Sequence, residues 1–390
     1  MLAGAVTAPR LITLSSEQAQ SSRDLPALSD ATSFALDLLR GLTAEAVVIG
    51  HALSFFRVLP GAQPPHVPAM QEVGVVIFFV LSGFLIAHTT WTRKSNAAAT
   101  NYGFRHFFID RFSRIYAGYV PALLFILLVD SISLLIAPGA YVHGGALDAK
   151  TALGNLLMLE NFPALDILHR RVASVPAIDR LGSGRPLWTL AVEWWIYMFF
   201  GWLVLARRRN RPWAYWSVLA LLSIVPAWNL VWGLGDGIAL AWVYGAGACA
   251  LIWRGTAAVF SRRAWTAAAC LCTAVTVTAG AYANGRAYDR VLVALIAATV
   301  TIGILGLQQS RLVVPATSRR WVRRVADYSF TLYLVHYTVL EATTLARGRV
   351  SDPALVVIGV VASNLLAVLL AALGEMRHRT LSTYLHRRFS

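Results

Sequence analysis

The stretch GVVIFFVLSGFLIAH, residues 74–88, decides what kind of protein this is. It lies within an apolar run of about 20 residues, the length that an α-helix needs to cross a bilayer. A backbone surrounded by hydrocarbon must satisfy its own hydrogen bonds, so such a run folds as a helix. Of the 390 residues, 57% are hydrophobic and only 14% are charged. Soluble domains carry about 25% charged residues. The sequence therefore predicts a protein embedded in a membrane.

Similar apolar runs flank this one on both sides. Most approach the length of a membrane crossing, and polar loops separate them. We therefore predict an all-α fold, a polytopic membrane helix bundle of about ten transmembrane helices. The predicted spans are 35–57, 69–91, 113–137, 187–206, 213–232, 236–253, 264–283, 289–307, 325–345 and 354–374. Within the second span, Ser82 and Gly83 form a small-residue patch that would let a neighbouring helix approach closely, and we assign this patch no chemistry.

Basic residues cluster in short loops at one end of these spans, and the formal net charge is +15. The positive-inside rule places such clusters in the cytosol, which ten crossings with both termini cytosolic accommodate. This pattern favours anionic membrane lipids over nucleic acid as the partners of the basic residues. The main clusters are Arg93 with Lys94, the RRRNR run at 207–211, Arg254 with Arg262 and Arg263, and the arginines within 319–324 and 377–388.

Three shorter segments complete the predicted organisation. Residues 151–162 (TALGNLLMLENF) are apolar but too short to cross, and a crossing there would place the 207–211 run outside. We expect a short re-entrant or interfacial helix there. Residues 1–33 are polar and predicted to be a disordered cytosolic tail, and residues 377–390 a basic cytosolic tail. The three cysteines lie in apolar runs without zinc-site spacing, so we expect no disulfide and no metal: Cys249, Cys270 and Cys272.

Ionisable residues within a span are costly and therefore suggest function. Arg40 lies near the cytosolic end of the first span and His51 in its outer half. Their separation of eleven residues is about three helical turns, or about 16 Å, which places both on nearly one face. Either residue alone has a plain explanation, because Arg40 could snorkel and His51 could bond a neighbouring helix. The pair on one stripe favours function.

Arg111 and Arg114 are three residues apart and therefore neighbours on one helix face at the cytosolic boundary. Positive-inside anchoring would explain either one. Two adjacent guanidiniums also make a bidentate grip for phosphate. The spacing alone leaves both interpretations open.

Glu193 lies about two turns below the outer end of its span, at a depth expected to match that of His51. A carboxylate beside an imidazole would hold its tautomer and raise its basicity. His336 lies near mid-membrane without an obvious structural need. For three other acidic residues we expect structural or interfacial roles: Asp37, Glu45 and Asp130.

Together these residues form a gradient, with arginines at the cytosolic end and His51, Glu193 and His336 farther out. A long donor with a phosphate-rich head and a reactive far end would fit this gradient. Its head would dock on the cationic residues, and its arm would reach between the helices towards an imidazole.

In this order, the segments resemble the acyltransferase-3 family of bacterial membrane O-acyltransferases, which includes surface-polysaccharide and lipopolysaccharide acetylases. The resemblance runs from about Leu36 to Leu340. It rests on LD-x-L-RG with the Arg-x10-His spacing, FFVLSGFLI, R-x-x-RIY, NLLMLEN, W-T-L-x-x-E and YS-x-x-LYLVH. It implies a ten-helix bundle in the bacterial inner membrane, with acyl-CoA, usually acetyl-CoA, as donor substrate and no permanently bound cofactor. Residues 34–376 would form the acyltransferase-3-like domain.

By this resemblance His51 would be the catalytic imidazole and Arg40 its motif partner, while Arg111 and Arg114 would bind CoA phosphates. Glu193 and His336 match the family's acidic and late-helix histidine positions. Departures from the family pattern at four positions leave the subfamily and the acceptor open: Leu38, Val76, Ala117 and Trp194.

We therefore expect an enzyme that transfers an acyl group from acyl-CoA to a hydroxyl of an extracytoplasmic saccharide or glycolipid. His51 would act as general base or form an acyl-histidine, and the sequence does not separate the two schemes. The alternative is a transporter that exports a saccharide or lipid-linked intermediate, because intramembrane charges also suit substrate paths. Transporters often show paired, broken repeats, and we find none in this sequence. The sequence specifies neither the acceptor sugar, nor the acyl group, nor the oligomeric state.

Overall fold

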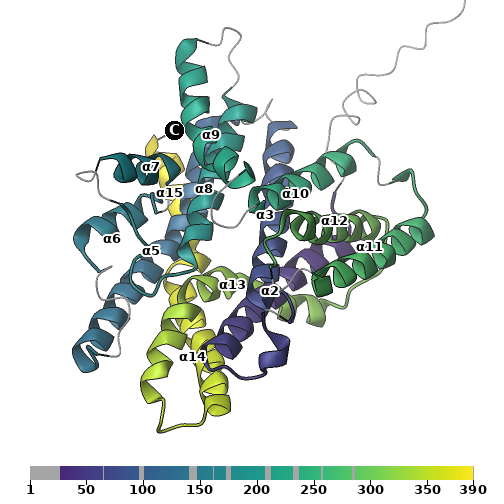
Figure 1. The fold of residues 1–390 in the computed structure, drawn as a ribbon. Helices are drawn as coiled ribbons and strands as arrows, with labels where there is room; N and C mark the ends of the chain where they lie inside the picture. Colours follow the sequence, from purple (N-terminus) through teal and green to yellow (C-terminus); the bar gives the residue numbers. More distant parts are fainter. Residues whose placement is uncertain are drawn as a thin grey trace, which may run out of the picture.

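The computed structural model describes residues 27–64, 66–95, 101–139, 147–160, 162–172, 177–206, 212–231, 237–255, 258–282 and 286–389. These ranges are helical apart from turns, loops and one isolated bridge between Arg347 and Val350. The predicted all-α helix bundle is confirmed (Figure 1). The helices are α2 (Asp30–Phe55), η1 (Pro60–Ala62), α3 (Met70–Ser95), α5 (Phe104–Ile136), α6 (Ala149–Leu156), α7 (Pro163–Arg171), α8 (Leu187–Leu205), α9 (Trp213–Val231), α10 (Ile238–Trp253), α11 (Arg262–Tyr282), α12 (Arg290–Gln308), α13 (Ala316–Thr343), η4 (Thr344–Ala346), α14 (Asp352–Leu373), η5 (Glu375–Arg377) and α15 (His378–Phe389).

Among the helices in the described ranges, eight are long and apolar enough to cross a membrane. They are α2, α3, α5, α8, α9, α11, α12 and the stretch from α14 through α15. The two remaining predicted spans correspond to α10, which has 16 residues, and to α13, whose first turns are rich in arginine. The protein is therefore a membrane protein of many spans, as predicted.

α2 and α13 pack against each other within the bundle. In Figure 1, α13 lies beside α2 and α14, and α13 also packs on α5. α11 and α12 lie together on the side of α2 away from α5, α6 and α7 (Figure 1). This arrangement brings residues from distant parts of the sequence to the α2–α13 contact.

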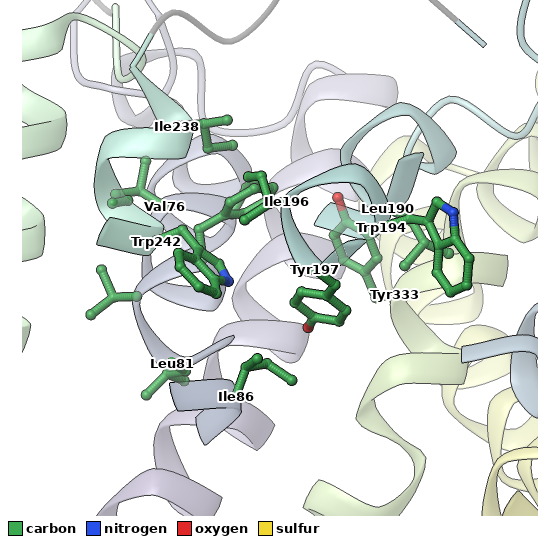
Figure 2. Packing of buried hydrophobic residues seen from close by; sticks show 14 of the residues in the cluster. Val76, Leu81, Ile86, Leu190, Trp194, Ile196, Tyr197, Ile238, Trp242 and Tyr333 are labelled. Atoms are coloured by element: carbon green, nitrogen blue, oxygen red, sulfur yellow. The ribbon is translucent and has the colours of Figure 1, made fainter. Parts of the chain in front are cut away.

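α3 and α10 approach each other closely through glycines. A Cβ atom at Gly83 would overlap the carbonyl oxygen of Trp242, and one at Gly245 would overlap that of Val80. Figure 2 shows Val76 of α3 near Ile238 and Trp242 of α10. The packing role predicted for the small-residue patch of α3 therefore agrees with the structure, because only glycine leaves room for the opposite backbone.

The short helix predicted within 151–162 is α6, whose eight residues are too few to cross a bilayer. Buried Asn155 accepts from the Leu181 amide (3.2 Å) and donates to the Asp179 carbonyl (2.7 Å). The Tyr119 hydroxyl donates to the Asn155 carbonyl (2.8 Å). These bonds fix α6 against α5 and against the loop that leads into α8.

The contacts of Asp110 hold the basic end of the bundle together. Asp110, at the basic end of α5, forms an ion pair with Arg93 of α3, and its Oδ1 atom lies 3.0 Å from the Nε2 atom of His386 of α15. Within the predicted basic tail, residues 378–389 thus form a helix that lies along α5. Residues 1–26 of the predicted N-terminal tail and the 207–211 run lie outside the described residues, and α2 begins at Asp30.

The α3–α10 contact yields a test with an internal control. Replacing Gly245 by Ala forces the two backbones apart, so we expect a loss of about 2 kcal/mol in the free energy of unfolding. Gly247 lies in the same helix, and a Cβ atom there meets nothing within 4 Å. Gly247→Ala should therefore be neutral or slightly stabilising. Unfolding of both variants in detergent checks this, and equal stability would contradict the close packing.

Candidate active site

Two histidines meet between α2 and α13. The Nδ1 atom of His51 lies 3.0 Å from the Nε2 atom of His336, and the ring centroids are 5.0 Å apart. His336 is fully buried, and His51 is partly buried. The structure thus brings together two predicted site residues that are 285 positions apart in the sequence. We refer to them as the histidine pair.

The surroundings of the histidine pair determine which nitrogen carries each proton. The Nδ1 atom of His336 lies 2.8 Å from the Tyr333 carbonyl oxygen and 3.2 Å from that of Leu332, so this nitrogen donates. The Nε2 atom of a neutral His336 then accepts, and the Nδ1 atom of His51 donates to it. The Val47 carbonyl oxygen, 3.1 Å from the same Nδ1 atom, requires a donor there as well. The Nε2 atom of His51 is consequently left with a free lone pair.

Three predicted arginines line one cavity of about 180 Å³. Arg40 comes from α2, and Arg111 and Arg114 come from α5; we call them the cavity arginines. Along α3 the lining extends from Val75 to Ile86, which corresponds to about 16 Å of helix. Figure 2 shows five of the other lining residues: Leu81, Ile86, Leu190, Tyr197 and Tyr333. The gathering of the arginines at one site is the arrangement that a polyanionic ligand needs.

The cavity arginines differ in how their charge is neutralised. Arg114 pairs with the Oε1 atom of Glu375 (3.0 Å), and Arg40 lies 3.4 Å from Asp37. Arg111 forms no ion pair with any described carboxylate and lies 5.8 Å from the ring centre of Phe107. The Nε atoms of Arg40 and Arg111 are buried and have no hydrogen-bond partner among the described residues. Unpaired buried donors of this kind suit an anion bound in the cavity.

Glu193 lies in this cavity and not beside His51. The Tyr197 hydroxyl donates to its Oε1 atom (2.5 Å), and Tyr197 also shares a hydrogen bond with Ser82 (2.8 Å). The structure brings His336, rather than Glu193, to the Nδ1 atom of His51. The physical reason is helix packing, because α8 packs on α3, α5 and α9, whereas α13 packs on α2.

Tyr333 stands between the cavity and the histidine pair. Its ring lines the cavity and lies 6.0 Å from the ring of His336, which follows one helical turn later. Its hydroxyl shares a 2.6 Å hydrogen bond with Thr189 of α8. Neither histidine belongs to the lining of the cavity. The Tyr333 ring therefore separates the lining of the cavity from His336.

A family model described as an acyltransferase domain matches residues 33–372 of this chain. The chain belongs to the acyltransferase-3 family. The match covers the helices from α2 to α14 almost completely, including the histidine pair and the cavity arginines. No curated protein and no solved structure shows a significant match. The protein is therefore a membrane acyltransferase, and its site must be interpreted from its own geometry.

Sequence reasoning missed three residues of this acyltransferase site. Tyr197 lies four positions after Glu193 and Tyr333 three before His336, so helical spacing could have indicated both. Glu375 lies 261 positions from Arg114, and no local pattern connects them. It also accepts hydrogen bonds from the amide and hydroxyl of Thr331 (both 2.9 Å), which hold its carboxylate in place.

The Glu375–Arg114 pair should contribute to stability because its carboxylate is only 1% exposed. Glu375→Gln removes a hydrogen bond between charged groups, and we expect a loss of about 2 kcal/mol in the free energy of unfolding, since such bonds contribute about 1.5–3 kcal/mol. The pair of Arg319 and Asp30 serves as control, with side chains 44% and 59% exposed. Arg319→Gln should cost about 0–1 kcal/mol. Denaturation in detergent compares the two, and equal losses would contradict this assignment.

Proposed function

We propose that this membrane acyltransferase transfers an acyl group, specifically acetyl, from acyl-CoA to a hydroxyl of an extracytoplasmic saccharide or glycolipid. The observation that carries the proposal is the cavity with three arginines that ends one helical turn from the histidine pair. A donor with a phosphate-rich head and a reactive thioester at its far end matches this polarity. The basic clusters support a topology with both termini in the cytosol. The location in the bacterial plasma membrane follows from the family resemblance.

The donor substrate fits the charges of the cavity. The phosphates of CoA are anions that guanidinium groups bind in a bidentate manner. Arg111 supplies a guanidinium without an ion pair among the described residues, and Arg40 and Arg111 supply unpartnered buried Nε donors. Arg114, held by Glu375, adds a positioned charge. The thioester arm would extend from these groups past Tyr333 towards His51.

The chemistry falls to the Nε2 atom of His51. It takes the proton of the acceptor hydroxyl as the oxygen attacks the thioester carbonyl, and the C–S bond then breaks. The imidazolium returns the proton to the departing thiolate, so that an ester and free CoA form. His336 positions His51 by accepting its Nδ1 proton, which fixes the tautomer that leaves Nε2 basic. In the acyl-histidine scheme the same Nε2 atom attacks the carbonyl first, and the ester forms in a second step.

Removal of the imidazole tests the role of His51. In membranes supplied with labelled acetyl-CoA, His51→Ala should lower labelling of the acceptor about 100-fold or more, as expected for the loss of a general base. His66 is exposed, and His66→Ala serves as the matched control with unchanged labelling. Both are compared at equal protein content. Wild-type labelling by His51→Ala would refute the mechanism, and a wild-type protein that labels no acceptor would refute the proposed function.

Removal of one cavity guanidinium tests the donor. Arg111→Gln should raise the KM for acetyl-CoA about tenfold, because hydrogen bonds to charged groups contribute about 1.5–3 kcal/mol. Acetyl-pantetheine carries the same thioester without any phosphate, so the variant and the wild type should use it equally well. Arg105, exposed on the same helix, provides the control Arg105→Gln. A variant that loses activity equally with both donors would contradict phosphate binding at Arg111.

A further inference from the structure

A second group of side chains lies on α2 and α13, beyond the histidine pair as seen from the cavity. Beyond His51 and His336, α2 reaches Phe55 and α13 reaches Tyr337. The Tyr337 ring meets the rings of His51 and Phe55 edge-on, with centroids 5.3 Å and 4.8 Å away. Two aromatic side chains thus form a step beside the imidazole, which we call the aromatic step (Phe55 and Tyr337).

Two arginines flank the aromatic step. The guanidinium of Arg185 lies 5.8 Å from the centre of the Tyr337 ring. Arg347 donates a hydrogen bond to the Phe55 carbonyl oxygen and lies 5.4 Å from the centre of the Phe56 ring. Both are exposed. The Arg185 guanidinium hydrogen-bonds the Tyr337 side chain, and both arginines interact electrostatically with Glu341. Each guanidinium has five N–H donors, so both keep donors for a ligand at this step.

The charges around the aromatic step are unbalanced. Arg57, directly after α2, and Arg349, two positions after Arg347, are also exposed. On the acidic side, Glu341 interacts electrostatically with Arg185 and Arg347, and Asp352 begins α14. Buried Asp130 also acts on Glu341, and Arg180 acts on Tyr337. Five arginines thus face three carboxylates around the aromatic step, and the net charge there is positive.

This positive charge lies at the end where the topology does not predict it. The basic clusters that orient the bundle lie at the opposite ends of α3, α5 and α13, and the positive-inside rule explains those alone. The positive-inside rule does not explain the arginines at the far end, beside the histidine pair. An anionic ligand bound next to His51 would explain them, because guanidiniums bind carboxylate and phosphate with good geometry.

We propose that the acceptor is anionic, a saccharide or glycolipid that carries a carboxylate or a phosphate. This inference rests on the proposed function and names the substrate class for the acceptor side of the same site. Arg185 and Arg347 bind the anion, while the aromatic step supports the body of the acceptor. Its hydroxyl then meets the Nε2 atom of His51 from the side opposite the donor. The two substrates thus bind on cationic surfaces on either side of one imidazole.

The charge of the product tests the proposal directly. Membranes that contain the wild-type protein are incubated with labelled acetyl-CoA, and the extracted product is applied to an anion-exchange resin at neutral pH. We expect the resin to retain the label and salt to elute it, whereas label that passes straight through would overturn the proposal. Mild acid, which cleaves sugar phosphates, distinguishes the sources. A label that then loses its charge indicates a phosphate-linked carrier, and one that keeps its charge indicates an acidic saccharide.

Variants of Arg185 and Arg347 test whether these arginines bind the anionic group of the acceptor. Arg185→Gln and Arg347→Gln should each lower labelling of the acceptor about tenfold, the loss of one charged contact, with an unchanged KM for acetyl-CoA. Arg286, exposed in the loop between α11 and α12, gives the control Arg286→Gln. An equal loss in the control would indicate general attraction to lipid headgroups and overturn the proposal. Unfolding in detergent confirms that each variant is folded. Absence of any labelled product in the wild type would instead refute the proposed function.

Discussion

The hydrogen bond between His51 and His336 joins α2 to α13, and the rest of the site depends on it. Each of these histidines donates through its Nδ1 atom, because a backbone carbonyl oxygen, which can only accept, lies beside that nitrogen. The chain therefore points a basic nitrogen in one direction without any carboxylate beside the imidazole. A shift of one helix against the other would break the hydrogen bond between the rings but leave both donors in place, because the carbonyls that fix each donor belong to the same helix as the histidine.

The cavity arginines are costly for a protein in hydrocarbon, because a desolvated charge lowers stability unless something compensates it. Glu375 and Asp37 compensate Arg114 and Arg40, but no described carboxylate compensates Arg111. This unequal neutralisation distinguishes a binding site from a structural network. In a fully paired network every charge would be neutralised, whereas the Arg111 guanidinium has a buried Nε without a hydrogen-bond partner among the described residues. Under the proposed function, the phosphates of the donor would neutralise it.

The sequence predicted the helices and the cavity arginines well, because apolar run length and helical spacing are local signals. His336 was also identified, since a polar side chain in a span is conspicuous on its own. The partners of these residues were harder to predict. Glu193 has a depth that suggests a contact with His51, but depth does not say which helices are neighbours. Glu375 meets Arg114 only because the chain folds back after α14, and no spacing rule encodes such a return.

The position of Tyr333 has a consequence for the membrane as a barrier. The cavity, which is largely apolar apart from its arginines and Glu193, lies on one side of the histidine pair, and an arginine-rich surface lies on the other. A water-filled connection between the two would make a path for protons and ions. The Tyr333 ring, whose hydroxyl shares a hydrogen bond with Thr189, lies between the cavity and His336 and would interrupt such a path. A substrate that fills the passage would replace the ring as a plug. Under the proposed function, acyl transfer would then proceed without short-circuiting the potential that the membrane maintains.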